Sequence, residues 1–236
     1  MKSNKYKDCF TIDYLMGPNS ITLLEEFLVK NPDAITGGTI LDLGCGKALT
    51  SVYIANETNA KTVYATDLWI SATENWKTIQ HWKLEDKVIP IHANALDLPF
   101  ADNFFDAIVS IDSYHYYGCE EQFFAKKILP LLKSGGYAFI CVPGLKAEFE
   151  QVPELMVEWL EGAVDNFHSA KWWEKHIQQG CDDLIEVTAY ESNQFDSCWQ
   201  DWINTGHEYA LRDAEFLNRG LNELLNFVML VVRKVG

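Results

Sequence analysis

The sequence predicts an α/β protein built on a doubly wound, mostly parallel sheet of seven strands. Segments with strand and helix periodicity alternate through residues 39–142. A glycine turn, Gly44-Cys45-Gly46, joins the first apolar strand to a helix, and Asp67 ends the second strand. We expect the final strand, 225–233, to be antiparallel and to follow a helical insertion.

The elements up to residue 142 follow a regular order. Residues 1–19 look irregular, and a helix over 21–30, capped by Asn19 or Ser20, follows them. Strands are expected over 39–43, 61–67, 87–92, 106–111 and 137–142. Helices are expected around 49–54 and over 71–84 and 120–132. Right-handed crossovers between such strands give a parallel sheet with helices on both faces.

The rhythm changes after residue 142. Two helices, 153–167 and 170–179, are expected without a strand between them. A strand over 183–190 and helical pieces over 197–217 then precede the closing strand. This order predicts one domain with an insertion before its last strands.

Composition narrows the possible functions. The formal net charge is −15, which argues against nucleic-acid partners because these usually bind a basic surface. The six cysteines are scattered without C-x-x-C pairs or histidines at zinc spacing, so we expect reduced thiols and no metal site. No signal segment and no membrane-spanning apolar run is present in the sequence. We therefore expect a cytoplasmic protein without a membrane partner.

The glycine turn lies at the strand end where such sheets bind ligands. Its glycines let the backbone approach a ligand, and the helix start offers free N–H groups. Asp67 can accept hydrogen bonds from the two hydroxyls of a ribose. A dinucleotide site would show G-x-G-x-x-G, but Leu49 takes the third position, and Asp42 would repel a pyrophosphate.

Four ordered motifs resemble those of class I S-adenosylmethionine-dependent methyltransferases. They are Leu41–Gly46, Asp67, Asn94–Asp106 and Leu131–Tyr137. The similarity covers roughly residues 35–142 and is to the small-molecule branch often called type 11 or ubiquinone-biosynthesis-like. It implies a Rossmann-like fold, S-adenosylmethionine as cofactor, and methyl transfer to an oxygen, nitrogen or carbon atom of a small-molecule acceptor.

The resemblance also implies a cofactor site. Asp67 would bind the ribose hydroxyls, and Leu68 would pack on the adenine. Asn94 stands where the family usually has an acid, and its carbonyl can still accept a hydrogen bond from the adenine amino group. Ala95 would offer its N–H to the ring. The full set implied around the cofactor is Asp42, Gly44, Cys45, Gly46, Asp67, Leu68, Asn94, Ala95, Ile111, Asp112 and Gly17.

The acceptor side is less defined. His115 follows the fourth strand and could act as a general base near neutral pH, or it could pack among its tyrosine neighbours. No base is obligatory, because alignment with an activated sulfonium can suffice. The aromatic insertion could form a lid whose rings bind the acceptor, or these rings could be its core. The candidate substrate residues are Tyr14, Tyr116, Trp172 and His168.

The expected organisation is a single domain, 1–236. It comprises an N-terminal cap segment (1–34), a cofactor-binding core (35–142), an insertion or lid (143–217) with a strand near 183–190, and a last strand (225–233). The alternatives are a non-catalytic S-adenosylmethionine-binding regulator and an NAD-dependent oxidoreductase. A monomer and a homodimer both remain open.

Overall fold

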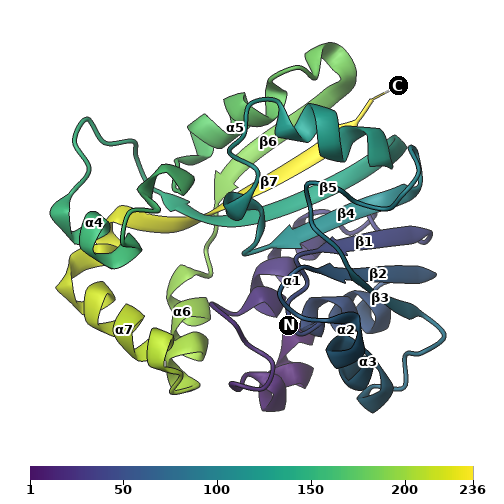
Figure 1. The fold of residues 1–236 in the computed structure, drawn as a ribbon, viewed down its shortest axis with the longest axis horizontal. Coiled ribbons are helices and arrows are strands. Elements are labelled where there is room, and N and C mark those ends of the chain that lie inside the picture. The colour runs from purple at the N-terminus through teal and green to yellow at the C-terminus, as the bar shows by residue number, and fades with distance from the viewer. Residues whose placement is uncertain (236) are drawn as a thin grey trace.

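The computed structural model describes residues 1–235 and contains a seven-stranded sheet in the order β3-β2-β1-β4-β5-β7-β6 (Figure 1). The strands are β1 Thr39–Leu43, β2 Thr62–Asp67, β3 Val88–His92, β4 Phe105–Ile111, β5 Leu132–Leu145, β6 Ile185–Glu191 and β7 Leu225–Lys234. Neighbours among β1 to β5 pair in parallel, whereas β7 is antiparallel to both β5 and β6. The predicted mostly parallel, Rossmann-like sheet with an antiparallel last strand is confirmed.

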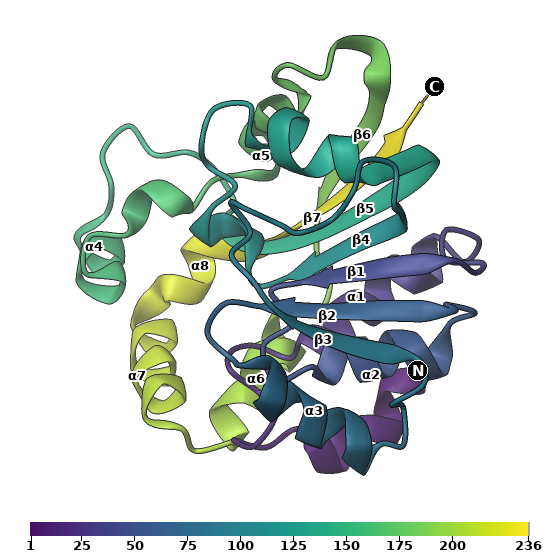
Figure 2. The ribbon, with the colours of Figure 1, turned by 45° about the vertical axis from the view of Figure 1, so that its right-hand side comes forward.

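The helices cover both faces and one end of this sheet. They are α1 Ser20–Lys30, α2 Leu49–Glu57, α3 Ala72–His81, α4 Glu154–Leu160, α5 Ala170–Gln178, α6 Phe195–Asn204, α7 Glu208–Phe216 and α8 Asn222–Leu224. Figures 1 and 2 show α1, α2 and α3 against one face and α5 against the other. Helices α4, α6 and α7 gather beyond the carboxyl ends of the parallel strands. No helix among the described residues is long and apolar enough to cross a membrane.

Alternate strand residues enter two cores. On β4, Val109 packs in the cluster that contains residues of α1 and α2, whereas Ile108 packs in the cluster that contains Trp173 of α5. Successive side chains of a strand point to opposite faces, so burial on both faces explains the nearly continuous apolar runs of β4 and β5. The carboxyl edge between the two cores is left for the site.

Local sequence explains where the first helices begin. Asn19 caps α1, because its side-chain oxygen accepts a hydrogen bond from the N–H of Thr22 at 3.2 Å. Ser71 and Glu74 form a capping box that starts α3. Helix α2 has no side-chain cap and instead follows Ala48, whose backbone is left-handed with φ of 63°.

Three expected segments differ from the structure. Residues Lys2–Cys9 form a 3₁₀ helix rather than an irregular start. The helix expected over 120–132 is reduced to a π-helical turn, Phe124–Ile128, and a 3₁₀ turn, Leu129–Leu131, in which Pro130 has no N–H to continue the ladder. The helix expected over 153–167 ends at Leu160, because the next two residues have positive φ.

Candidate active site

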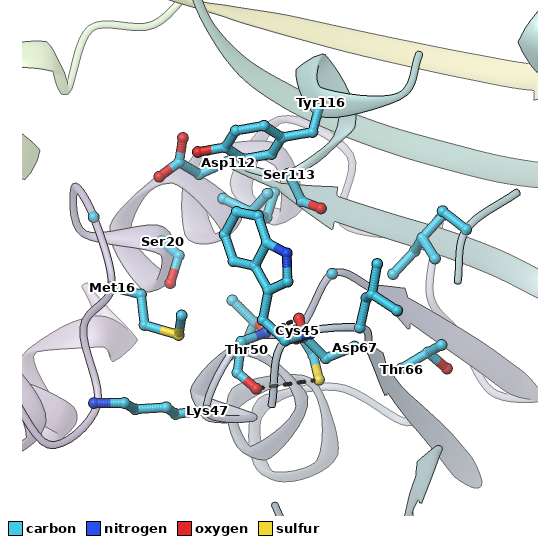
Figure 3. Close-up of a pocket in the computed structure, with 18 of the residues that line it drawn as sticks. Met16, Ser20, Cys45, Lys47, Thr50, Thr66, Asp67, Asp112, Ser113 and Tyr116 are labelled. Atoms are coloured by element: carbon cyan, nitrogen blue, oxygen red, sulfur yellow. Dashed lines mark hydrogen bonds between the residues drawn. The ribbon is translucent and has the colours of Figure 1, made fainter. Parts of the chain in front are cut away.

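A cavity of about 460 Å³ opens at the carboxyl ends of β1, β2 and β4, where doubly wound sheets bind ligands. Its volume is within the usual range for small-molecule sites. Figure 3 shows Cys45 and Asp67 on one side of the space and Asp112 and Tyr116 on the other. The predicted residues that line it are Tyr14, Gly17, Gly44, Cys45, Gly46, Asp67, Leu68, Asn94, Ala95, Ile111, Asp112 and Tyr116.

The glycine turn is tied to β2 by its own backbone. The N–H groups of Gly44 and Cys45 donate to the carbonyl of Thr66 at 2.8 and 3.1 Å. The N–H of Gly46 donates to Oδ2 of Asp67 at 2.8 Å. The three N–H groups of the turn itself are therefore used by β2, whereas the expected free N–H groups belong to the start of α2 at Leu49.

Asp42 lies behind the turn and is not part of the cavity wall. Its buried carboxylate accepts hydrogen bonds from Thr50 Oγ1 at 2.6 Å and Ser51 Oγ at 2.5 Å, both in the first turn of α2. Burial raises the pKa of Asp42 to about 6, although these two hydrogen bonds act in the opposite direction. Asp42 therefore fixes α2 against β1, and its predicted contact with the cofactor is not seen in the wall.

Asp67 organises the loop after β2. Its Oδ1 accepts hydrogen bonds from the N–H groups of Trp69 and Ile70 at 2.7 and 2.8 Å, in addition to the Gly46 contact of Oδ2. A carboxylate offers about four lone-pair sites. The three backbone donors therefore leave capacity for a further hydroxyl donor from the cavity.

The loop after β3 supplies the next part of the wall. The side-chain oxygen of Asn94 accepts a hydrogen bond from the N–H of Leu96 at 3.0 Å. Ala95, the next residue, is buried, whereas Leu68, the first residue after β2, is half exposed. Asn94 thus uses one of the two lone pairs of its carbonyl oxygen and keeps the other.

Asp112 lies directly after β4 in a left-handed conformation, with φ of 56°. Its carboxylate lies so close to Gly17 that a Cβ added there would come within 2.4 Å of Oδ2. Among residues 1–235 this carboxylate has no hydrogen-bond donor and no cationic partner. Burial, and secondly the negative charge of Asp213, raise the pKa of Asp112 to about 7.

Two exposed aromatic rings stand at the same end of the cavity. The side chains of Trp69 and Tyr116 are 64% and 56% exposed, and their ring centroids lie 5.1 Å apart in an edge-to-face arrangement. In Figure 3 the Asp112 carboxylate lies beside the Tyr116 ring, across the space from Met16 and Ser20. The cavity therefore has an aromatic and acidic end.

His115 is outside this wall. It is only 4% exposed, and its ring packs 4.0 Å from the Tyr116 ring and 5.8 Å from the Phe167 ring. Burial lowers the pKa of His115 to about 3, and Nδ1 has no hydrogen-bond partner within the described residues. The imidazole is neutral at pH 7, and the structure does not bring the predicted general base to the cavity.

His168 and Trp172 are also outside the wall. Their rings stack on each other with centroids 3.5 Å apart, and the His168 ring contacts Glu148 Oε2 at 3.2 Å and the Asp165 carbonyl at 3.0 Å. The neighbouring Trp173 anchors α5 on the sheet. No residue from 143–217 lines the cavity, so an acceptor role for His168 and Trp172 stays a prediction.

The N-terminal segment closes the cavity instead. Lys47 of the turn donates from Nζ to the Ile12 carbonyl at 2.6 Å. Asn19 donates from Nδ2 to Asp201 Oδ2 at 2.6 Å, and its N–H donates to the carbonyl of Cys198 in α6 at 3.2 Å. These bonds hold the intervening segment, with Tyr14 and Gly17, against the cavity.

Several residues of the cavity wall were not predicted from the sequence. The apolar run that directly follows Asp67 was a usable signal for Trp69, because an exposed strand end rarely carries large apolar side chains without a ligand. No local pattern marks the others, which are placed by tertiary packing. They include Ser20, Lys47, Thr50, Thr66, Ser113 and Tyr117.

Comparison with known proteins gives a consistent result. Residues 41–140 match a family described as a methyltransferase domain. Sterol methyltransferase-like 1 from Botryococcus braunii is 24% identical over 221 residues, which cover 91% of this chain and 54% of that protein. The chain spans about half the length of the curated relatives that it matches first.

Solved structures share the fold. Phosphoethanolamine N-methyltransferase 2 from Haemonchus contortus, in complex with S-adenosyl-L-methionine, has a TM-score of 0.76 at 16% identity, covering 100% of this chain and 57% of that one. Geranyl diphosphate C-methyltransferase from Streptomyces coelicolor has a TM-score of 0.70 at 17% identity, covering 91% of this chain and 76% of that one. At these identities the likeness shows the fold alone.

The matched region runs from β1 into β5 and carries most of the cavity wall, including the glycine turn, Asp67, Asn94 and Asp112. These are the residues on which the resemblance in the sequence rested, and that resemblance is confirmed. Residues 41–140 of this chain are thus similar to a methyltransferase domain and lie on a Rossmann-like sheet.

Proposed function

We propose that the protein transfers the methyl group of S-adenosylmethionine to an oxygen, nitrogen or carbon atom of a small-molecule acceptor. The observation that carries this proposal is the cavity wall, in which a glycine turn, Asp67 and Asn94 surround one space. Neighbours of similar fold act on phosphoethanolamine and geranyl diphosphate, according to their names, and were solved with S-adenosyl-L-methionine and S-adenosyl-L-homocysteine.

The residues present fit this cofactor. Asp67 keeps lone-pair capacity for a ribose hydroxyl, and Asn94 keeps one lone pair for the adenine amino group. The half-exposed side chain of Leu68 offers an apolar surface for the adenine ring. When bound, S-adenosylmethionine supplies a methyl group already activated by its sulfonium. The protein then has to align the acceptor with that methyl and exclude water.

The cavity supports the dinucleotide alternative less well. A pyrophosphate is bound by free N–H groups at the turn and helix start. Here β2 uses the N–H groups of Gly44, Cys45 and Gly46. Leu49 also replaces the third glycine of the dinucleotide pattern. An NAD-dependent oxidoreductase is therefore the weaker reading.

The shape of the cavity supports an enzyme over a non-catalytic regulator. A regulator needs only a closed pocket around the cofactor. This cavity extends from the glycine turn to Asp112 and Tyr116, and the Tyr116 ring is exposed. An acceptor can therefore reach the end of the site at β4.

Isothermal calorimetry tests the proposal directly. S-adenosylhomocysteine should bind, NADH should not, and Asp67→Ala should weaken S-adenosylhomocysteine binding by about 1–3 kcal/mol through the lost charge-assisted hydrogen bonds. Asp86→Ala is the matched control, because Asp86 is an exposed acid outside the cavity wall and should leave binding unchanged. Binding of NADH without S-adenosylhomocysteine would overturn the proposal.

The finer expectations accompany this proposal and stay predictions. They are action in the cytoplasm, the absence of a nucleic-acid partner, and assembly as a monomer or homodimer. The division of the chain into a cap segment, a cofactor-binding core and an insertion is also a prediction.

A further inference from the structure

One end of the cavity carries a negative charge that the protein does not neutralise. The cavity wall contains two acids, Asp67 and Asp112, and one basic residue, Lys47. Asp67 is bound by three backbone N–H groups, and the Lys47 ammonium donates to the Ile12 carbonyl. Asp112 has neither kind of partner among the described residues.

The position of Asp112 is built into the backbone. Its left-handed conformation, with φ of 56°, and the hydrogen bond from its N–H to the Cys141 carbonyl at 2.8 Å hold the residue at the strand end. The absence of a side chain at Gly17 leaves room for the carboxylate, which a Cβ would approach to 2.4 Å. The carboxylate therefore stays at the wall instead of turning to solvent.

The Tyr116 ring lies beside this carboxylate, and the Trp69 ring packs against Tyr116. The ring centroids of Trp69 and Tyr116 lie 5.1 Å apart in an edge-to-face arrangement. Both side chains are largely exposed, although large aromatic side chains are usually buried. The face of an indole or phenol ring attracts a cation, and a carboxylate next to such rings adds a full opposite charge. This combination recognises an ammonium group.

A second acid, Asp213, adds to the negative potential at Asp112. Asp213 of α7 accepts hydrogen bonds from Nε1 of Trp159 at 2.8 Å and Nε1 of Trp202 at 3.0 Å, so its charge is fixed in place. This charge contributes to the raised pKa of Asp112, which lies close to 7. A cation bound at Asp112 would relieve the repulsion between the two carboxylates.

We propose that the methyl acceptor is a cationic amine, held by the carboxylate of Asp112 and the rings of Trp69 and Tyr116. The inference rests on the proposed function and names the substrate class of the same site. An uncharged apolar acceptor would use the rings but would leave the carboxylate without a partner. A phosphate-bearing group would be repelled at this end of the cavity.

The same carboxylate accounts for the proton. An ammonium has no lone pair, so Asp112 first accepts one N–H proton and leaves a neutral amine. The lone pair of the amine forms the new N–C bond, while the C–S bond breaks and its electron pair stays on sulfur. The product is the methylated ammonium, and Asp112 then releases its proton to water. A carboxyl group with a pKa close to 7 can carry out both transfers.

A pair of isosteric probes tests the charge preference. Choline and its neutral carbon isostere, 3,3-dimethylbutan-1-ol, are titrated into the protein saturated with S-adenosylhomocysteine. Choline should bind at least about tenfold more tightly than the isostere. Asp112→Asn, which keeps a residue tolerant of positive φ, should abolish the preference for choline. Asp86→Asn, an exposed acid outside the wall, should leave this preference unchanged.

Other outcomes would contradict the proposal of a cationic acceptor. Equal binding of the two probes would assign the aromatic end to an uncharged acceptor and overturn the proposal. An Asp112→Asn variant that loses affinity for S-adenosylmethionine but keeps the preference for choline would show that Asp112 serves the cofactor's own cationic groups. Tyr116→Leu gives a second measurement, because it should weaken choline binding more than isostere binding. Failure of S-adenosylhomocysteine to bind would contradict the proposed function instead, and the probe comparison would then be made on the free protein.

Discussion

The contact between Gly44 and Ser113 gives the sharpest test of the cavity geometry. Gly44 has φ of +74°, and a Cβ placed on it would lie 1.8 Å from Oγ and 2.4 Å from Cβ of Ser113. Ser113 belongs to the loop after β4, so this contact joins two walls of the cavity. Gly44→Ala therefore requires a left-handed alanine and forces the two loops apart.

A control variant separates the backbone cost of Gly44→Ala from its overpacking cost. An alanine in the left-handed region costs about 1–2 kcal/mol, and overpacking at a tight contact adds about 1–3 kcal/mol. Gly135 has nearly the same φ, +77°, but a Cβ there meets nothing within 4 Å. Gly135→Ala should therefore show only the backbone cost, whereas Gly44→Ala should lower the free energy of unfolding by about 2–5 kcal/mol.

Urea denaturation measures both variants, and calorimetry with S-adenosylhomocysteine reports the cavity. Gly44→Ala should weaken S-adenosylhomocysteine binding at least tenfold, or about 1.4 kcal/mol, because the wall itself moves. Gly135→Ala should leave binding unchanged. Adding Ser113→Gly to Gly44→Ala removes both clashing atoms and should restore the overpacking part of the lost stability. Equal losses of stability in the two single alanine variants would refute this account of the contact.

Two further predictions concern buried titratable groups. His115→Phe should keep turnover within about threefold and should not lower the free energy of unfolding. The substitution removes a buried, neutral imidazole that has no partner at Nδ1, and it keeps the ring contacts. A turnover loss above about a hundredfold in a folded variant would instead show that His115 acts as a general base. For Asp112 the folded pKa of about 7 exceeds the ordinary pKa of an aspartate, 3.8, so its contribution to stability is complete below pH 3.8 and is lost as the pH rises to 7. The Asp112→Asn variant lacks this loss. Its free energy of unfolding, relative to that of the native protein, should therefore increase by about 1–3 kcal/mol between pH 5 and pH 8 in urea titrations. A difference in unfolding free energy that stays constant with pH would contradict the raised pKa.

The fold was predictable because its signals are local. The strands of a doubly wound sheet are buried on both faces, so each appears as a short apolar run between turns. The glycine turn and Asp67 are adjacent to such runs, and their place at the carboxyl edge follows from the topology alone. Helix ends were predictable where a capping side chain such as Asn19 marks them.

The acceptor end was not predictable, because it depends on which way side chains turn. Trp172 and Trp173 are neighbours in α5, yet Trp173 packs on the sheet and Trp172 stacks between two histidines away from the cavity. His115 and Tyr116 are neighbours in one 3₁₀ turn, yet His115 faces the core and Tyr116 lines the cavity. A sequence pattern without regular periodicity does not specify these directions.

The bond between Asn19 and Asp201 has a consequence for how the chain folds. It spans 182 residues, and with the Asn19 contact to α6 it fastens the segment that carries Gly17 to a helix made much later in synthesis. The β1–β5 part of the sheet can form from nearby segments, but this closing contact has to wait for the loop between its ends to be completed. During synthesis on the ribosome the Lys47–Ile12 contact can therefore form before the contacts of Asn19, which fasten the N-terminal wall only after α6 has emerged.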